Sequence, residues 1–249
     1  MSFRMVKEWA ICVLAAVALT ACGGGGGGDS GGGTPTPTPA PTVTSTSSFP
    51  FAAGYRARIV SGATDNFNLN APSTCTGSST IATAASQTNN FEGVNGFSAG
   101  QTSTISFNNC LPATGSQTGT TYYDANYLPI GLMIVGGEYS KYTALPTALP
   151  ATLKIGDPNA SGVISTQTSY SDSTQATPTG RRQIAYEIKA DTATTAIANV
   201  ITRSYDTNNN LLATQINAFR MAESGALTLL SIDVQFSTTS SVRLIYTPR

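Results

Sequence analysis

The residues in this sequence that could do chemistry are limited by the complete absence of histidine. Without imidazole, Ser-His-Asp and Cys-His nucleophile systems are excluded, as are histidine acid–base catalysis and zinc sites that need a histidine ligand. No Ser-x-x-Lys motif occurs, and the acidic residues are scattered singly along the chain. We therefore predict no catalytic residue, no cofactor and no metal site.

Tyrosines form the densest cluster of side chains suited to binding. Five of them fall within twenty-one residues, interleaved with Asp124, Asn126 and Glu138. Aromatic rings beside polar groups suit stacking on a sugar or contact with a protein partner. The alternative is a local aromatic core. We take the cluster as the candidate binding surface, with the members Tyr122, Tyr123, Tyr127, Tyr139 and Tyr142.

Three shorter motifs have simpler explanations. Arg181-Arg182 suits an anion, but such pairs usually face solvent at the start of a strand. The segment GDPNASG (156–162) has too few acidic residues for an EF-hand loop and predicts a turn. The segment SYDTNNNLL (204–212) resembles one copy of the Tyr-Asp repeat of Rhs-like secreted proteins, although a hairpin turn of Asn and Asp explains it without a repeat.

Residues 1–21 have the features of a signal peptide. Two basic residues precede a twelve-residue apolar run, 10–21, which is too short for a membrane helix of about twenty residues. The run ends in LTAC (19–22), which resembles the lipobox of bacterial lipoproteins. This resemblance implies cleavage before Cys22 and acylation of its sulfur and its new amino group. Gly23 in place of Asp implies sorting to the outer membrane of a Gram-negative bacterium; the alternative is an ordinary signal peptide with a chance cysteine.

The segment that follows Cys22 predicts a tether. Residues 23–33 are mostly glycine and read as a flexible coil, and residues 34–42 alternate Thr and Pro, which favours polyproline II. We expect 22–48 to be a disordered linker that holds a folded domain away from the membrane. Lys plus Arg and Asp plus Glu number 13 each, so the net charge offers no argument for a nucleic-acid partner.

Cys75 and Cys110 are the two cysteines that remain beyond the signal segment and the lipobox. An even pair in an oxidising compartment usually forms a disulfide, and the alternatives are two free thiols or a metal site with carboxylates. The text around the pair, over residues 70–140, resembles uncharacterised Gram-negative outer-membrane lipoproteins: Cys then Gly, Phe-Glu-Gly, and a strand ending in Asn-Cys. The resemblance carries no known activity and assigns no catalytic residue.

Beyond residue 48 the pattern changes to short β-type runs separated by turn residues. Few charges and abundant Ser and Thr are typical of an extracytoplasmic all-β fold. We predict a β domain over 49–249, a sandwich or an open barrel-like sheet, with the polar segment 172–180 as a long loop or a subdivision. No helix is expected after residue 49. The runs in the first part of the domain are 54–61, 79–85, 102–108, 128–137, 151–156 and 162–171.

The last seventy residues give the clearest pattern. Alternating runs with short turns predict an antiparallel meander over 181–247, with one face buried and the other in water. The side chains expected on the buried face are Ile184, Tyr186, Ile188, Ile232, Val234 and Phe236.

These observations favour a non-enzymatic protein. We expect a lipid-anchored outer-membrane lipoprotein whose β domain binds a protein or glycan partner or supports the envelope. The alternative is a hydrolase that uses carboxylates alone, such as a glycosidase, which would need two carboxylates converging in a cleft. The periplasmic or outward orientation and the oligomeric state are not indicated by the sequence.

Overall fold

Long antiparallel strands make up most of the chain that the computed structural model describes, which comprises residues 47–70, 76–108, 114–237 and 243–249. The signal segment, Cys22 and most of the tether lie outside the described residues, as do Cys75 and Cys110. The strands are β1 (Ser48–Phe49), β2 (Ala63–Asn70), β3 (Thr76–Thr83), β4 (Gln87–Phe91), β5 (Val94–Asn108), β6 (Thr114–Tyr123), β7 (Pro129–Ile134), β8 (Tyr139–Tyr142), β9 (Leu153–Lys154), β10 (Ser161–Tyr170), β11 (Pro178–Ala190), β12 (Thr195–Asp206), β13 (Leu211–Ala222), β14 (Leu227–Phe236) and β15 (Arg243–Pro248).

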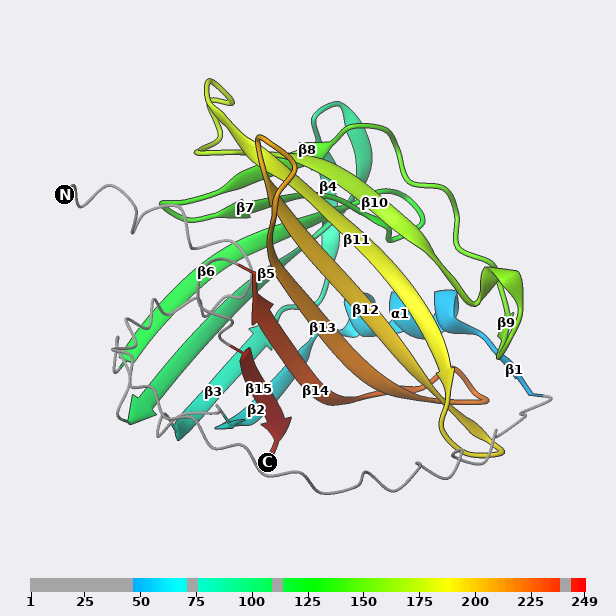
Figure 1. The fold of residues 1–249 in the computed structure, drawn as a ribbon. Coiled ribbons are helices and arrows are strands. Elements are labelled where there is room, and N and C mark those ends of the chain that lie inside the picture. The colour runs from blue at the N-terminus through cyan, green and yellow to red at the C-terminus, as the bar shows by residue number, and fades with distance from the viewer. Residues whose placement is uncertain (1–46, 71–75, 109–113, 238–242) are drawn as a thin grey trace, which may run out of the picture.

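Twelve of the described strands close into an antiparallel barrel (Figure 1). Neighbours in the ring follow the chain from β10 to β15, after which β15 pairs with β2 and β2 with β3. The seam is at β5: β3 pairs with its second half, from Thr76↔Asn108 to Thr83↔Gln101, and β4 pairs with its first half. The small strands β1 and β9 form a separate pair, next to the short 3-10 helix η2 (Pro158–Ala160).

The predicted all-β class and the C-terminal meander are confirmed. Strands β11 to β15 pair in chain order, and all six side chains expected on the buried face are buried. Closure of the ring makes that face the inside of a barrel. The polar segment 172–180 covers most of the connection between β10 and β11 and the first three residues of β11, and these two strands pair directly with each other.

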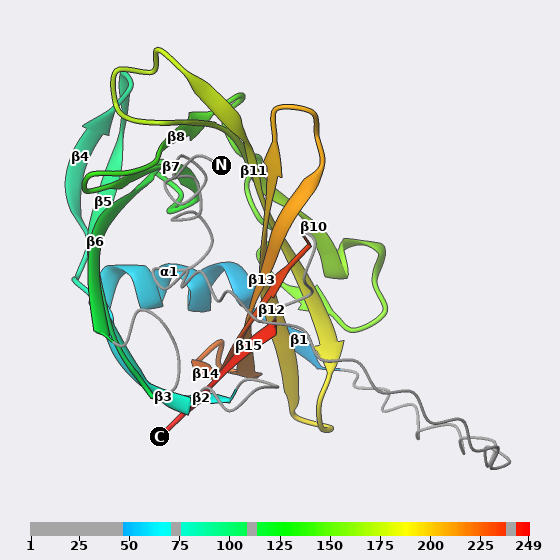
Figure 2. The same cartoon turned by 60° about the vertical axis from the view of Figure 1, so that its left-hand side comes forward.

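One helix, α1 (Phe51–Ser61), lies across the inside of the barrel, between the wall formed by β5 and β6 and the wall formed by β11 to β14 (Figure 2). It starts after Pro50, contains three alanines and two arginines, which favour helix, and ends before Gly62 at φ 69°. A side chain at Gly62 would place its Cβ 2.5 Å from the Thr83 carbonyl oxygen, so glycine is needed there.

This helix corrects two expectations from the sequence. Residues 54–61 are not a strand, and a helix does follow residue 49. From Tyr55 to Ile59, apolar or aromatic residues alternate with arginines, which is the period-two pattern expected of a strand. An amphipathic helix would show one apolar stripe, but α1 has both apolar and charged neighbours inside the barrel and therefore shows no such stripe. Within the described segments, no helix has both the length and the apolar character that crossing a bilayer requires.

The interior of the barrel divides into an apolar part and a polar part. The apolar core is continuous around β11 to β15 and β2, and it includes the first turn of α1 through Phe51, which stacks on Tyr186 with ring centroids 5.4 Å apart. Beside the cavity, inward positions of β3, β5 and β6 carry the polar or small residues Thr83, Gln101, Gly119 and Thr121. The apolar part therefore holds the fold together, and the polar part is where a site can form.

Candidate functional site

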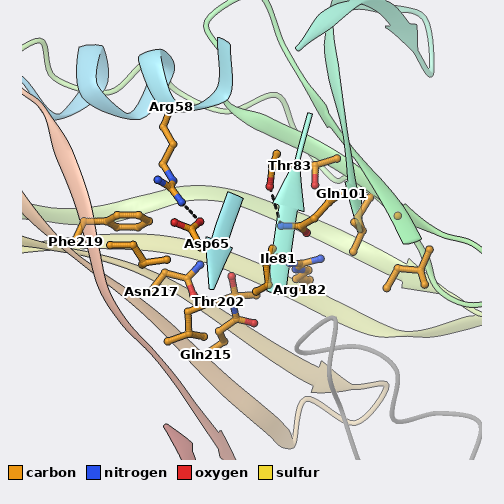
Figure 3. A pocket seen from close by; sticks show the side chains of 16 residues that line it. Arg58, Asp65, Ile81, Thr83, Gln101, Arg182, Thr202, Gln215, Asn217 and Phe219 are labelled. Carbon is orange, nitrogen blue, oxygen red and sulfur yellow. Dashed lines mark hydrogen bonds and ion pairs between the residues drawn. The ribbon is translucent and has the colours of Figure 1, made fainter. Parts of the chain in front are cut away.

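A cavity of about 210 Å³ lies inside the barrel, beside α1 (Figure 3). A second cavity of about 170 Å³ adjoins it, because six lining residues are common to both. The shared residues combine charged, hydroxyl, amide and aromatic groups, and they are Arg58, Thr83, Gln101, Thr121, Asn217 and Phe219. They come from α1, β3, β5, β6 and β13, so the site exists only when the ring is closed around the helix.

An ion pair between Arg58 and Asp65 forms one wall of the cavity. The guanidinium of Arg58 extends from α1 and donates a hydrogen bond to the carboxylate of Asp65 at the start of β2 (Figure 3). The same guanidinium lies over the ring of Phe219, 5.2 Å from its centroid. Arg58 is therefore held from two sides, and its charge is neutralised.

Amide and hydroxyl side chains line much of the rest of the cavity. The Gln101 amide donates to the Thr83 hydroxyl at 3.2 Å, and the Gln215 amide donates to the Asn217 side-chain oxygen at 2.8 Å. These groups can donate to and accept from a polar molecule in the cavity.

Arg182 and Glu138 form the second charged element of the interior. Arg182 lines the cavity from β11, and its Nε is buried with no hydrogen-bond partner in the described part of the chain. Glu138, between β7 and β8, is 4% exposed and accepts a 2.7 Å hydrogen bond from the Ser169 hydroxyl, while its Oε2 is unpaired among the described residues. Burial raises the pKa of Glu138 above its ordinary value, although the nearby Arg182 acts against this shift.

The two arginines of the Arg181-Arg182 motif lie on opposite faces of the barrel wall. Arg181 faces outward, 3.7 Å from the ring centroid of Tyr205, and its Nε donates to Asn209 at 2.9 Å. Arg182 faces inward, as alternation along a strand requires. One residue of the pair is therefore a surface group and the other a cavity group.

The five tyrosines of the predicted binding surface do not share one surface. Tyr123 and Tyr127 are buried inside the barrel with Ile59 of α1, and Tyr127 stacks on Phe97 with centroids 4.1 Å apart. Tyr123 also lines the smaller cavity. Burial raises the pKa of Tyr123 to about 12, so its hydroxyl stays neutral at physiological pH.

The other three tyrosines belong to a cluster around Phe91, at the hairpin between β4 and β5. The Tyr122 ring stacks on Phe91 with centroids 4.1 Å apart, and the Tyr139 hydroxyl donates to the carboxylate of Glu92. The Tyr142 hydroxyl donates to the Glu92 carbonyl oxygen at 3.3 Å. These contacts make Tyr122, Tyr139 and Tyr142 part of a local aromatic cluster.

Cys75 and Cys110 lie outside the described residues, but Thr76, next to Cys75, and Asn108, two residues before Cys110, are described. Thr76 and Asn108 are register partners at the end of the β3–β5 ladder. The described residues contain no group of three or more Cys, Asp or Glu side chains arranged to hold a metal ion.

Most of the cavity residues were not singled out from the sequence. Asp65, Gln101 and Asn217 are single polar residues in polar strands, and nothing in the pattern distinguishes those that face inward. Arg182 belonged to a noted motif, but the motif did not show which arginine faces the interior. The chain matches no protein-family model, and neither the curated proteins nor the solved structures contain a significant match to it.

Proposed function

We propose that this protein is a lipid-anchored extracytoplasmic lipoprotein whose barrel binds a small polar molecule in its interior without catalysis. The observation that carries this proposal is the cavity of about 210 Å³, whose wall combines amides, hydroxyls and charged groups. Small-molecule sites are concave and contain a few convergent polar groups against apolar surface, and Phe219, Leu229 and Ile232 supply the apolar part here.

The anchor in this proposal is the lipid on Cys22. The twelve-residue apolar run, the small residues before the cysteine and the Gly and Thr-Pro tether after it support attachment to the outer membrane of a Gram-negative bacterium. Several acyl chains on one residue hold a protein far more firmly than a single chain does. The tether then lets the barrel reach a ligand at a distance from the membrane.

The distribution of carboxylates favours binding over hydrolysis. Glycosidases place two carboxyl groups on either side of the scissile bond, about 5–10 Å apart. Among the residues that line the larger cavity, Asp65 is the one carboxylate, and it is engaged in the ion pair with Arg58. Glu138 does have the raised pKa of a general acid, but it is buried against Ser169 and does not line the cavity.

The test is a variant that fills the cavity. Thr121 faces the cavity from β6, so Thr121→Phe occupies the space that a ligand needs. Its neighbour Thr120, a register partner of Met133, points to the other face, and Thr120→Phe is the matched control. Native mass spectrometry of protein isolated from its own envelope should show a small-molecule adduct in the wild type and in Thr120→Phe.

The adduct should be absent in Thr121→Phe. An equal adduct in both variants would place the ligand outside the barrel and contradict the proposal. Release of product from chromogenic glycosides by the wild type, abolished by Asp65→Asn, would favour the hydrolase instead.

A further inference from the structure

We propose that the cavity recognises a molecule with an oxyanion, such as a carboxylate, and that Arg182 binds this anionic group. The inference rests on the proposed function, because it assigns a ligand class to the same cavity. It starts from the balance of charge on the cavity wall. The charged lining residues are Arg58, Asp65 and Arg182; the first two neutralise each other, which leaves the charge of Arg182.

Arg182 has no counter-ion in contact. No carboxylate of the described residues lies within 4.0 Å of its guanidinium, and its Nε is buried without a hydrogen-bond acceptor. Arginine side chains stay protonated in proteins, so the guanidinium of Arg182 is a positive charge inside the barrel. Arg182 as a whole is half-buried, but a buried N–H without an acceptor is costly, and an oxyanion ligand that accepts from this Nε removes the cost when it binds.

Glu138 does not act as the missing counter-ion. It is close enough for its ionisation to be influenced by Arg182, yet the two side chains make no ion pair. Its burial favours the neutral carboxyl, and its Oε1 is occupied by the Ser169 hydroxyl. Because no ion pair joins Glu138 to Arg182 in the described part of the chain, the guanidinium of Arg182 is open to an oxyanion from a ligand.

The groups around Arg182 suit the remainder of such a ligand. Thr121, Thr202 and Asn217 line the same cavity, Thr202 from the adjacent strand β12 and Asn217 from β13, the strand beyond it. A guanidinium offers two parallel N–H groups that match the two oxygens of a carboxylate, and hydroxyl and amide groups can bind the polar atoms beyond it. The geometry thus fits a small hydroxylated acid better than a neutral sugar.

The experiment compares acids with their neutral amides by isothermal titration calorimetry on the full-length protein in detergent. The probes are acetate against acetamide and D-glucuronate against D-glucuronamide. In the wild type, at least one acid should bind more tightly than its amide by roughly 10- to 100-fold, the range in affinity that charge-assisted hydrogen bonds account for. Arg182→Gln should remove this preference, and Arg182→Lys should keep part of it.

Arg181→Gln is the matched control, because it removes the same charge one residue away on the outer face. It should bind the acids as the wild type does. Equal binding of acid and amide by the wild type, or an unchanged preference in a folded Arg182→Gln, would overturn the inference and leave the proposed function standing. If Arg182→Gln does not fold, the acid–amide pairs in the wild type and Arg182→Lys decide the question.

The remaining outcomes separate the two proposals. Failure of every acid and amide to bind the wild type would overturn both the inference and the proposed cavity. Binding that survives Thr121→Phe would place the anion elsewhere on the protein and would also overturn both.

Discussion

At the level of single residues, the interior of this barrel holds ionisable groups in unequal environments. Arg58 and Asp65 neutralise each other at the edge of the cavity, whereas Arg182 and Glu138 each keep a buried polar atom without a partner among the described residues. Glu92, on the β4–β5 hairpin, is instead satisfied by Tyr139, Lys141 and Gln175. Two carboxyl groups of the same type therefore respond to their surroundings in opposite ways.

The pH dependence of stability should show this contrast. A carboxyl whose pKa is raised on folding binds more protons in the folded state, so its contribution to stability falls as pH rises through the folded-state pKa. Burial raises the pKa of Glu138. The free energy of unfolding of Glu138→Gln, measured relative to that of the wild type, should therefore be higher at neutral pH than in acid. Well below the ordinary pKa of 4.5, Glu138 is protonated in both the folded and the unfolded state, so this advantage of the variant disappears. Urea unfolding across this pH range measures the difference.

Glu92→Gln is the control with the opposite sign. The hydrogen bond from Tyr139 lowers the pKa of Glu92, so this carboxylate contributes stability at neutral pH that is lost as pH falls through its folded-state value. The variant should be less stable than the wild type at neutral pH, and the gap should shrink in acid. Two pH profiles with the same slope would contradict the assignment of both environments.

At the level of elements, α1 decides how the barrel interior is divided. Its first turn belongs to the apolar core through Phe51, while Arg58 and Ile59 at its other end contact the polar cavity and the Tyr123–Tyr127 cluster. The helix can lie close to the wall because Gly54 meets the β13–β14 turn with no side chain: a Cβ at this position would lie 2.0 Å from the Gly225 carbonyl oxygen.

Gly54→Ala therefore tests the placement of the helix. Helix propensity alone predicts a gain of about 1 kcal/mol for this change. The contact with a backbone oxygen predicts the reverse, a loss of roughly 1–3 kcal/mol from overpacking, because neither chain can move aside cheaply. Urea unfolding of the purified protein measures the sign.

Ala53→Gly, at an exposed position of the same helix, is the control and should cost roughly 0.5–1 kcal/mol through propensity alone. A Gly54→Ala variant as stable as the wild type would show that α1 does not approach the β13–β14 turn as described.

The seam between β3 and β5 is the second element that closes the barrel, and it carries the prediction for Cys75 and Cys110. Thr76, which follows Cys75 in the chain, and Asn108, two residues before Cys110, are register partners. We predict a disulfide between the cysteines, which are 35 residues apart. Chain-entropy arithmetic for a loop of this size gives about 3–4 kcal/mol of stabilisation. Mass spectrometry of non-reduced peptides should find the cross-linked pair.

Single and double serine variants check the energetic part of this prediction. Cys75→Ser, Cys110→Ser and the double variant should be destabilised about equally, because each loses the same bond. Two free thiols in protein taken from its native compartment, or additive losses in the double variant, would contradict the disulfide.

At the level of the whole molecule, we propose that a lipidated cysteine and a tether precede the folded barrel. The prediction at this scale is that Cys22→Ser releases the protein from the membrane fraction, because the proposed anchor is the lipid on this cysteine. Fractionation with a high-salt wash measures the release. Cys12→Ser, within the apolar run of the signal segment, is the control and should leave the protein in the membrane fraction. Firm membrane association of Cys22→Ser would contradict the lipid anchor.

Several properties were determined by the sequence alone, because they depend on local patterns. Period-two alternation marked β11 to β15 and the side chains that face inward, such as Ile184, Tyr186 and Val234. The absence of histidine excluded whole classes of catalysis. The strands β2, β4 and β6 were missed because segments rich in Thr, Gly and Asn resemble loops, and β8 was missed because its four residues are too few to show a period.

Only the tertiary structure decided where the site lies. Arg58, Asp65, Gln101, Arg182 and Asn217 meet because β15 pairs with β2 and β3 pairs with β5, and these long-range pairings leave no periodic signal in the sequence. The helix could not be predicted from the sequence for a related reason. Its neighbours lie on several walls of the barrel, so it has no single apolar stripe. Local pattern thus specified the apolar residues that face inward along β11 to β15, while ring closure specified which polar residues meet around the cavity.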